Sequence, residues 1–327
     1  MAIFNSVFKD DIANYLSSRK TVRSVSTFMN DVYCLSSFDK FLASTGLQEK
    51  AITEPVFNGW QKTLTGKNIT RACKIVAVRT FFKYLRSLGV SVYMPVVPKV
   101  IDGYSPYIFS DEELSRILSA ADNNLFAKKQ QNPYMKTEFP MIFRLLYGCG
   151  LRIGETLALQ MKDIDLEGGI LTLLHAKNGK HRLVPMSRSL TAIMRRYCLA
   201  MGITGSPEAF LFPRKNPERP ITIPSARYRF NAVLKNLGIA LPNRKRRERG
   251  PCQHCLRHVF VFKSFAQAQA NGRSIDDSVP FLSIFLGHDS LRETEKYLKF
   301  SSELFPNALE LFEQYAGAAF PEADYEK

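Results

Sequence analysis

The chain has 327 residues, of which 45 % are hydrophobic, which excludes a disordered chain and is enough for one large or two ordinary domains. It has no apolar run of about eighteen residues, so we expect no membrane span, and Met1–Lys20 is too charged for a secretory signal. Lys and Arg exceed Asp and Glu by 45 to 30, and the net charge of +15 favours a polyanionic partner such as nucleic acid.

The chain begins with a stretch that we expect to be helical throughout, residues 1–93. Apolar residues recur at helical spacing within three segments of it, 7–16, 24–41 and 69–88. The third segment also has a basic face, which suits a helix that packs inward on one side and contacts DNA phosphates on the other. A solvated face is the alternative explanation of these charges. The predicted DNA contacts on this face are Lys67, Arg71, Lys74 and Arg79.

A segment with three prolines and a glycine interrupts the helical pattern, so we predict that residues 94–107 are a linker between two domains. The first domain would then cover residues 1–93 and the second residues 108–327. Ser110, followed three residues later by Glu113, is a capping-box pattern and predicts that the second domain opens with a helix.

Residues 108–327 are again mostly helical in pattern, with one β element. Residues 169–175 and 182–185 have the composition of strands and flank Asn178-Gly179, a strong signal for a tight hairpin turn. We therefore predict a fold that is mainly α with a small β-sheet. The further helices expected here are 223–237, 254–270, 280–285, 291–298 and 303–315.

Four separated motifs carry side chains that suit chemistry on an anionic phosphodiester. In chain order they are Gly150–Glu155 at a helix start, Ala176–Lys180 at the hairpin tip, His254–His258, and Leu286–His288 with Tyr297 nine residues later. Each motif alone is weak, but all four in this order and at these separations are a specific signal.

Together these motifs resemble the signature of the tyrosine recombinase family, also called the phage integrase family. Its catalytic domain carries Arg, Lys, His-x-x-Arg, His or Trp, and Tyr in this order. The resemblance covers about residues 106–300, and residues 1–93 are similar, with less specific motifs, to the family's helical, SAM-like core-binding domain. It implies a two-domain clamp on double-stranded DNA that exchanges strands at specific recombination sites through a 3′-phosphotyrosyl intermediate, without metal or ATP.

Tyr297 is the expected nucleophile. No nucleotide-binding loop is visible, so strand exchange must conserve bond energy, and a covalent protein–phosphate intermediate does this. Tyrosine suits the role because its phenolate is a competent leaving group when the strand is rejoined. Tyr297 has the family's spacing from His288, whereas Tyr315 and Tyr325 do not.

Arg152 and Arg257 are expected to clamp the scissile phosphate. Planar guanidinium groups suit the negative charge that develops on its non-bridging oxygens, and preorganised charge of this kind contributes strongly to catalysis. The resemblance assigns His254 and His288 to hydrogen bonds with the phosphate and to proton transfer with the nucleophile.

The departing 5′ oxygen needs a proton, and the resemblance places a general-acid lysine on the hairpin. Lys177 matches the family position, and Lys180 is its rival. Glu155 and His258 are expected to orient the arginine clamp rather than to react, since Glu155 lies one helical turn from Arg152.

Further partner contacts are predicted outside the catalytic residues. The resemblance implies a homotetramer on DNA, and the apolar segment 304–315 is a candidate for docking onto a neighbouring subunit, with packing within its own subunit as the alternative. A dense basic run ahead of the third motif is expected to contact DNA, with a solvated loop as the alternative. The predicted DNA contacts in this run are Arg244, Lys245, Arg246 and Arg247, and those at the hairpin are Lys180 and Arg182.

The cysteines raise the alternative of a metal site. Cys252-x-x-Cys255, beside His254 and His258, could be half of a zinc knuckle, but the sequence has no second Cys-x-x-Cys pair. We therefore expect no metal and no cofactor. Six scattered cysteines are not a disulfide framework, and they favour a reducing, cytoplasmic and nucleoid-associated location.

Two other functions compete with recombination. A type IB topoisomerase shares the chemistry but relaxes DNA without exchanging partners, and a DNA-binding regulator could keep the fold without catalysis. All motif positions are filled, which argues against the regulator. The chain begins almost directly at the core-binding pattern, so we expect no additional arm-binding domain before it. This favours a dimer resolvase or the integrase of a small mobile element.

Overall fold

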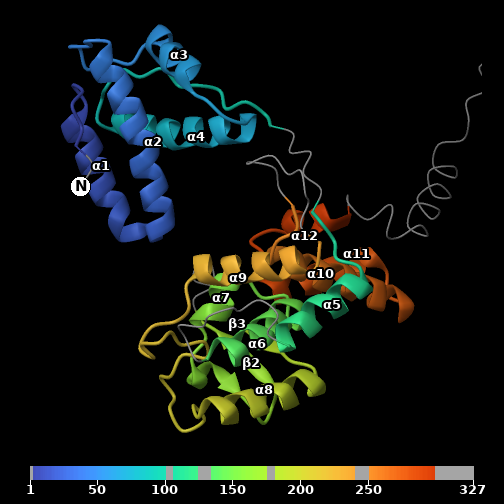
Figure 1. The fold of residues 1–327 in the computed structure, drawn as a ribbon. Helices are drawn as coiled ribbons and strands as arrows, with labels where there is room; N and C mark the ends of the chain where they lie inside the picture. The colour runs from blue at the N-terminus through green and yellow to red at the C-terminus, as the bar shows by residue number, and fades with distance from the viewer. Residues whose placement is uncertain (1–2, 101–105, 124–133, 175–180, 240–249, 299–327) are drawn as a thin grey trace, which may run out of the picture. The chain divides into compact units, whose positions relative to one another are not determined.

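The computed structural model describes residues 3–100, 106–123, 134–174, 181–239 and 250–298. The chain divides into two compact units, residues 1–104 and 105–327 (Figure 1). The described residues are mainly helical, with one three-stranded sheet, so the predicted fold class is confirmed. The assignment of residues 1–93, 94–107 and 108–327 as core-binding domain, linker and catalytic domain stays a prediction.

The first unit is built from helices around an aromatic core. Three of its helices match the predicted segments 7–16, 24–41 and 69–88 with shifted ends, and α3 is a separate short helix. Trp60 and Phe38 are fully buried, with ring centroids 5.2 Å apart in an edge-on arrangement. The helices are α1 (Lys9–Val22), α2 (Val25–Ser44), α3 (Glu54–Thr63) and α4 (Asn68–Ser87).

The second unit holds most of the helices. Its first helix begins with the predicted capping box, because the Glu113 N–H donates to Ser110 Oγ and the Ser110 N–H donates to the Glu113 carboxylate. The helices are α5 (Asp111–Asp122), α6 (Met135–Gly148), α7 (Ile153–Ala158), the 3-10 turn η1 (Met161–Asp163), α8 (Arg188–Met201), α9 (Ile223–Asn236), α10 (His254–Ala270), α11 (Ile275–Leu286) and α12 (Leu291–Leu298).

Helix α11 is longer than the predicted segment 280–285. The Ser274 side chain accepts the Asp277 N–H and so caps the helix at Ile275, ahead of Pro280. The helix ends at Gly287, whose φ of 64° is the left-handed conformation that favours glycine at this position. The predicted helices 254–270 and 291–298 are confirmed to the residue, and α9 ends one residue before the predicted 237.

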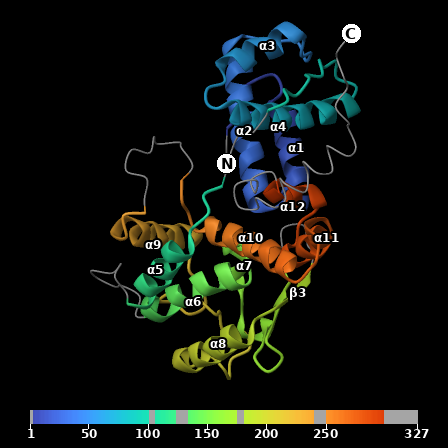
Figure 2. The same cartoon turned by 90° about the vertical axis from the view of Figure 1, so that its right-hand side faces the viewer.

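The sheet is antiparallel, in the order β1 (Ile164–Asp165), β2 (Ile170–Leu173), β3 (Arg182–Pro185). β2 pairs with β3 from Ile170 opposite Pro185 to Leu173 opposite Arg182. The described strand is thus shorter than the predicted 169–175, and the expected turn at Asn178-Gly179 lies outside the described residues. Figure 2 shows β3 running close to α11, which it contacts.

Two hydrophobic clusters hold the second unit together. In the larger one, α6 packs against α5, α8 and α10, with Phe139, Ile142 and Leu145 fully buried. A smaller cluster joins α10, α11 and α12, and it includes Tyr297. Within the described part of the chain, no helix is both long and apolar enough to cross a lipid bilayer.

Candidate active site

Helix α10 presents three of the predicted site residues. His254, Arg257 and His258 lie at positions i, i+3 and i+4, so they share one face of the helix. Val261 and Phe262 continue this face and are buried in the small cluster. His254 is exposed at the helix start, whereas Arg257 is only 1 % exposed and His258 9 %. One helical stripe therefore runs from an accessible imidazole into the core.

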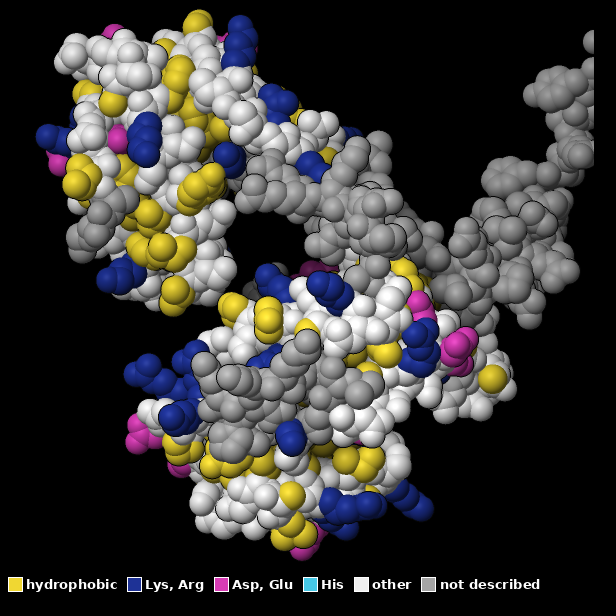
Figure 3. All heavy atoms as spheres, in the orientation of Figure 1, with side chains coloured by type: hydrophobic (Ala, Val, Ile, Leu, Met, Phe, Trp, Pro, Cys, Tyr) yellow, Lys and Arg dark blue, Asp and Glu magenta, His cyan; other side chains and the backbone are white. Residues whose placement is uncertain are grey.

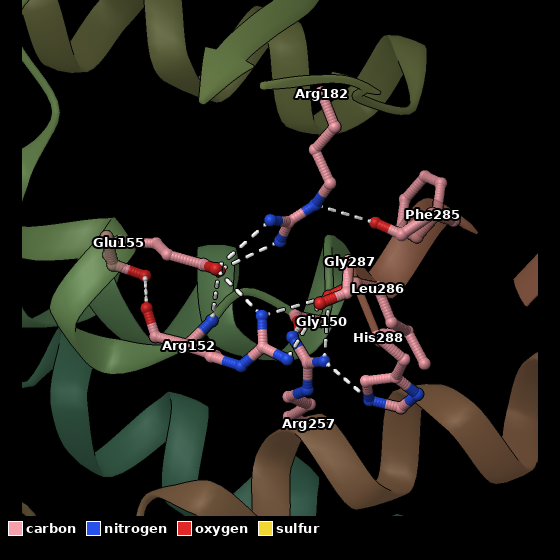
Figure 4. A network of polar contacts seen from close by, with 10 residues as sticks. Gly150, Arg152, Glu155, Arg182, Arg257, Phe285, Leu286, Gly287 and His288 are labelled. Carbon is pink, nitrogen blue, oxygen red and sulfur yellow. Dashed lines mark hydrogen bonds and ion pairs between the residues drawn. The ribbon is translucent and has the colours of Figure 1, made fainter. Parts of the chain in front are cut away.

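Arg152 and Arg257 converge on the carboxyl end of α11 (Figure 4). Arg152 donates from Nη1 to the Leu286 carbonyl at 3.2 Å and from Nη2 to the Gly287 carbonyl at 3.0 Å. Arg257 donates from Nη2 to the same Leu286 carbonyl at 3.0 Å and from Nη1 to the Gly150 carbonyl at 2.6 Å. The last carbonyls of a helix lack partners within it and carry partial negative charge, so they hold the two cations in place.

Gly150 must be glycine for this arrangement. Its φ is +58°, and a Cβ added there would lie 2.4 Å from Cδ1 of Phe260. Any other side chain would displace either the Phe260 ring or the Gly150 backbone, whose carbonyl accepts the Arg257 hydrogen bond. The first motif therefore supplies a backbone acceptor as well as Arg152.

Glu155 is the carboxylate at the centre of the cluster. It accepts from Arg152 Nη1 at 3.0 Å, from the Arg152 N–H at 2.9 Å, and from both terminal nitrogens of Arg182 at 3.0 and 2.8 Å. Burial favours the neutral acid, but the hydrogen bonds from Arg182 and Arg152 outweigh it and lower the pKa of Glu155 to about 2. Glu155 therefore lies where a residue that orients the clamp is expected.

Arg182, one of the predicted DNA contacts, is bound within the protein. Its Nε donates to the Phe285 carbonyl at 2.9 Å, and its other two nitrogens donate to Glu155. The side chain is only 8 % exposed. All three nitrogens are thus engaged within the protein, and the guanidinium ties β3 to α7 and α11. Its contact with DNA stays a prediction.

The cluster keeps an excess of positive charge, because three guanidinium groups share one carboxylate. Burial and the nearby Arg152 lower the pKa of Arg257 to about 10, which still leaves it charged at neutral pH. Arg152 is 24 % exposed, so the excess charge remains accessible from solvent. A partly buried positive site of this kind suits an anionic phosphodiester.

His288 lies at the edge of this cluster with a defined tautomer. Arg257 Nη2 lies 3.1 Å from His288 Nε2, and arginine can only donate, so Nε2 is the acceptor. Nδ1 therefore carries the proton and donates to Thr294 Oγ1 at 2.6 Å. Burial, followed by Arg257 and Arg152, lowers the pKa of His288 to about 3, so the ring is neutral at physiological pH.

Tyr297 is buried beside these residues. Its side chain is 7 % exposed, and its Oη lies 3.1 Å from His258 Nδ1. The ring lies parallel to that of His288, with centroids 6.4 Å apart, and edge-on to Phe262 at 5.9 Å. Burial raises the pKa of Tyr297, although the charge on Arg257 opposes this effect. The phenol is therefore protonated at neutral pH.

The structure thus brings seven predicted residues into one site. These are Arg152, Glu155, His254, Arg257, His258, His288 and Tyr297. Two of its features were not predicted from the sequence, Thr294 and the contact between His258 and the phenol. Thr294 could have been noticed from its spacing, since it lies one helical turn before Tyr297 on α12. Lys177, Lys180, Arg244, Lys245, Arg246, Arg247 and the segment 304–315 lie outside the described residues.

In the first unit, the predicted DNA contact Lys67 precedes α4 and is exposed, whereas Arg71 and Lys74 on α4 are half-buried. Lys67 and Arg71 line a groove together with Lys99, and Lys74 Nζ lies 5.3 Å from the ring centre of Tyr33. Arg79 is half-buried. Figure 3 shows Lys and Arg side chains interspersed with hydrophobic ones on the visible face of this unit. Their contact with DNA stays a prediction.

The cysteines are all free thiols. Cys252 and Cys255 lie close together at the start of α10, with sulfur atoms 3.7 Å apart. Among the described residues, no group of three or more His, Cys, Asp and Glu side chains is arranged to hold a metal ion.

Comparison with known proteins gives consistent results. The model of the phage integrase family matches residues 108–303. A putative integrase/recombinase, y4rB, from Sinorhizobium fredii is 29 % identical over 74 % of this chain and 78 % of its own. Tyrosine recombinase XerA from Pyrococcus horikoshii is 26 % identical over 94 % of each chain. The structure of XerH site-specific recombinase, bound to its difH substrate after cleavage, has a similar fold, with a TM-score of 0.66 at 19 % identity over 92 % of this chain and 84 % of that one.

Proposed function

Because the chain belongs to the phage integrase family, we propose that it breaks and rejoins DNA through a covalent link to Tyr297. It is a tyrosine-type site-specific recombinase. The observation that carries the assignment of Tyr297 is its position: the buried phenol lies against His258 and parallel to His288, and His288 in turn accepts from Arg257.

The proposed reaction begins when the scissile phosphate enters the positive cluster. Arg152 and Arg257 neutralise its non-bridging oxygens, and His288 contributes to their orientation through its bond to Arg257. Tyr297 Oη attacks the phosphorus, the bond to the 5′ oxygen breaks, and a 3′-phosphotyrosyl link remains. Rejoining reverses these events with a 5′ hydroxyl from the partner strand. The link conserves the energy of the phosphodiester, so the reaction needs no ATP.

The general acid of this reaction is proposed to be Lys177, with Lys180 as the rival. Both belong to the segment between β2 and β3, and Arg182 at the start of β3 is bound to Glu155 and the Phe285 carbonyl. This attachment supports the proposal, because it fixes one base of the hairpin beside the clamp.

We further propose the partners and the setting. The substrate is double-stranded DNA with specific recombination sites, which the first unit contacts through Lys67, Arg71, Lys74 and Arg79. Four copies assemble on two duplexes, with segment 304–315 as the candidate docking element. The six free thiols support a reducing compartment, and we place the protein in the cytoplasm with the nucleoid. A mobile element or a dimer-resolution system would supply the sites.

A nicked DNA substrate tests the central assignment. DNA from the genomic flanks of the gene, nicked close to the cleavage site, releases a short fragment with a free 5′ hydroxyl and so traps the covalent adduct. Wild type should give a denaturant-resistant protein–DNA band without metal or ATP, and Tyr297→Phe should give none. Tyr315→Phe is the matched control and should keep the band. A band that persists in Tyr297→Phe would overturn the assignment. Relaxation of any supercoiled plasmid, without a site requirement, would favour topoisomerase action instead.

A further inference from the structure

The hydrogen-bond partner of the nucleophile is not one of the two histidines expected to share its proton. His258 Nδ1 lies 3.1 Å from Tyr297 Oη, and the two rings are tilted at 56° with centroids 5.3 Å apart. From the sequence, His258 is expected only to orient the clamp. At this distance its ring nitrogen touches the atom that must lose a proton when it attacks phosphorus.

The other two histidines are differently engaged. His288 accepts from Arg257 through Nε2 and donates to Thr294 through Nδ1, so neither nitrogen is available to the phenol in this arrangement. His254 is exposed, and its ring lies edge-on to that of His258 with centroids 4.7 Å apart. Among the described histidines, His258 is therefore the one placed to accept the phenol proton, while His254 remains accessible to the phosphate.

We propose that His258 is the general base of the reaction, accepting the Tyr297 proton at Nδ1 during cleavage and returning it during rejoining. The proposal deepens the proposed function and rests on Tyr297 being the nucleophile. In cleavage, the Oη–P bond forms, the P–O5′ bond breaks, and the phenol proton passes to Nδ1. The 5′ oxygen leaves with a proton from a separate general acid. In rejoining, His258 protonates the departing phenolate.

The surroundings of His258 suit this role. Burial, followed by the neighbouring His254 and Arg257, lowers the pKa of His258 to about 3, so the ring is unprotonated at physiological pH and, without substrate, a weak base. Burial also keeps Tyr297 protonated, so the phenol needs a base. The groups facing the ring are His254, Arg257 and Tyr297 itself. An anionic phosphate bound at Arg257 offsets the repulsion from that guanidinium and makes the ring a stronger base when substrate is present.

Two DNA substrates, which differ in the atom at the 5′ bridging position, distinguish the loss of a general base from the loss of a general acid. With the natural 5′ oxygen the leaving group needs a proton, whereas a 5′-bridging sulfur leaves as a thiolate without one. His258→Asn keeps a polar group near the position of Nδ1 but cannot accept a proton. We expect it to slow single-turnover cleavage of both substrates by at least about 100-fold, the scale of general base catalysis. Lys177→Ala should be slow only on the oxygen substrate.

His258→Ala gives an independent readout, because it leaves a space beside the phenol. On the sulfur substrate, added imidazole should restore cleavage by His258→Ala in proportion to the concentration of unprotonated imidazole. It should not change the rate of Lys177→Ala, which has no defect on that substrate. Filter binding and thermal unfolding establish that each variant is folded and binds DNA.

Cleavage by His258→Asn at the wild-type rate would overturn the proposal, as would a defect that the sulfur substrate repairs. A wild-type protein that forms no adduct at all would instead refute the proposed function.

Discussion

Arg182 and Glu155 form a two-point ion pair that joins β3 to α7, with Nη1–Oε1 and Nη2–Oε2 distances of 3.0 and 2.8 Å. Their side chains are 8 % and 7 % exposed. The pair lies next to the phosphate clamp, because the same carboxylate also accepts from Arg152. We therefore expect both stability and catalysis to depend on the Glu155 carboxylate.

Glu155→Gln should destabilise the protein by about 3 kcal/mol, because it leaves three neighbouring guanidinium groups without a carboxylate in a buried site. Arg182→Lys is the matched variant and should cost less, since it keeps the positive charge and one contact to Glu155. Urea unfolding of the two variants and wild type gives the order of their unfolding free energies. Equal stability of Glu155→Gln and wild type would contradict the role assigned to this carboxylate.

The same ion pairs predict how the cost of Glu155→Gln varies with pH. Folding lowers the pKa of Glu155 to about 2, below its ordinary value of about 4.3, so its contribution is fully present above the ordinary value and is lost as the pH falls through about 2. The difference in unfolding free energy between wild type and Glu155→Gln should therefore be constant near neutrality and shrink between about pH 4.5 and 2. A difference that stays constant down to pH 2 would contradict this.

The lowered pKa of His258 predicts a second dependence of folding stability on pH, in a higher pH range. Its pKa falls to about 3 on folding, so below its ordinary value of about 6.5 the unfolded chain binds a proton that the folded chain does not. Stability should decrease as the pH falls from about 6.5 towards 3, by up to about 1.4 kcal/mol per pH unit from this residue. Denaturant unfolding of His258→Asn should show a shallower slope than wild type over that window, and parallel slopes would refute the assignment.

Thr294→Val tests how His288 is oriented. Valine fills nearly the same volume but removes the acceptor of the His288 Nδ1–H bond, and Thr294 is fully buried. The loss of a buried partner should cost about 1–3 kcal/mol and reduce the cleavage rate about tenfold, without weakening DNA binding. Thr294→Ser keeps the hydroxyl and should preserve the rate. Single-turnover cleavage at saturating protein separates the rate from binding.

Cys252 should be the most reactive thiol of the chain. The Cys255 thiol donates a hydrogen bond to Cys252, and this, against the opposing effect of burial, lowers the pKa of Cys252. Iodoacetamide at neutral pH should therefore modify Cys252 before the exposed Cys73. Mass spectrometry of tryptic peptides gives the order in which the cysteines are modified. Cys255→Ala removes the donor and should slow the modification of Cys252; an unchanged rate would show that the contact has no such effect.

Much of the site was predictable because its signals are local. His254, Arg257 and His258 share a helix face by spacing alone, and the Ser110 capping box needs only a four-residue segment. The bounds of α10 and α12 follow from uninterrupted periodicity. Motif order supplied the rest, since it placed Arg152 and Tyr297 in one site although they are far apart in the chain.

The contacts that sequence reasoning missed join distant segments. Arg182 pairs with Glu155, 27 residues away, and with the Phe285 carbonyl, 103 residues away. A basic residue next to a motif was therefore expected to bind DNA, because nothing local indicates a buried carboxylate. The His258 contact was missed for the same reason, since its partner lies on α12. Pro280 concealed the true start of α11, which the Ser274 cap determines.

The carbonyls at the end of α11 have a consequence for how this chain can change. Arg152, Arg182 and Arg257 are held there by backbone oxygens of Phe285, Leu286 and Gly287, so the contacts do not depend on which side chains occupy positions 285 and 286. They depend instead on the direction in which the last carbonyls of α11 point around the helix axis. Inserting or deleting one residue within α11 would turn these oxygens by about 100° around the axis. Since Leu286 is buried and Phe285 stacks on Phe260, the clamp should thus tolerate apolar substitutions of similar size there but not a change in length.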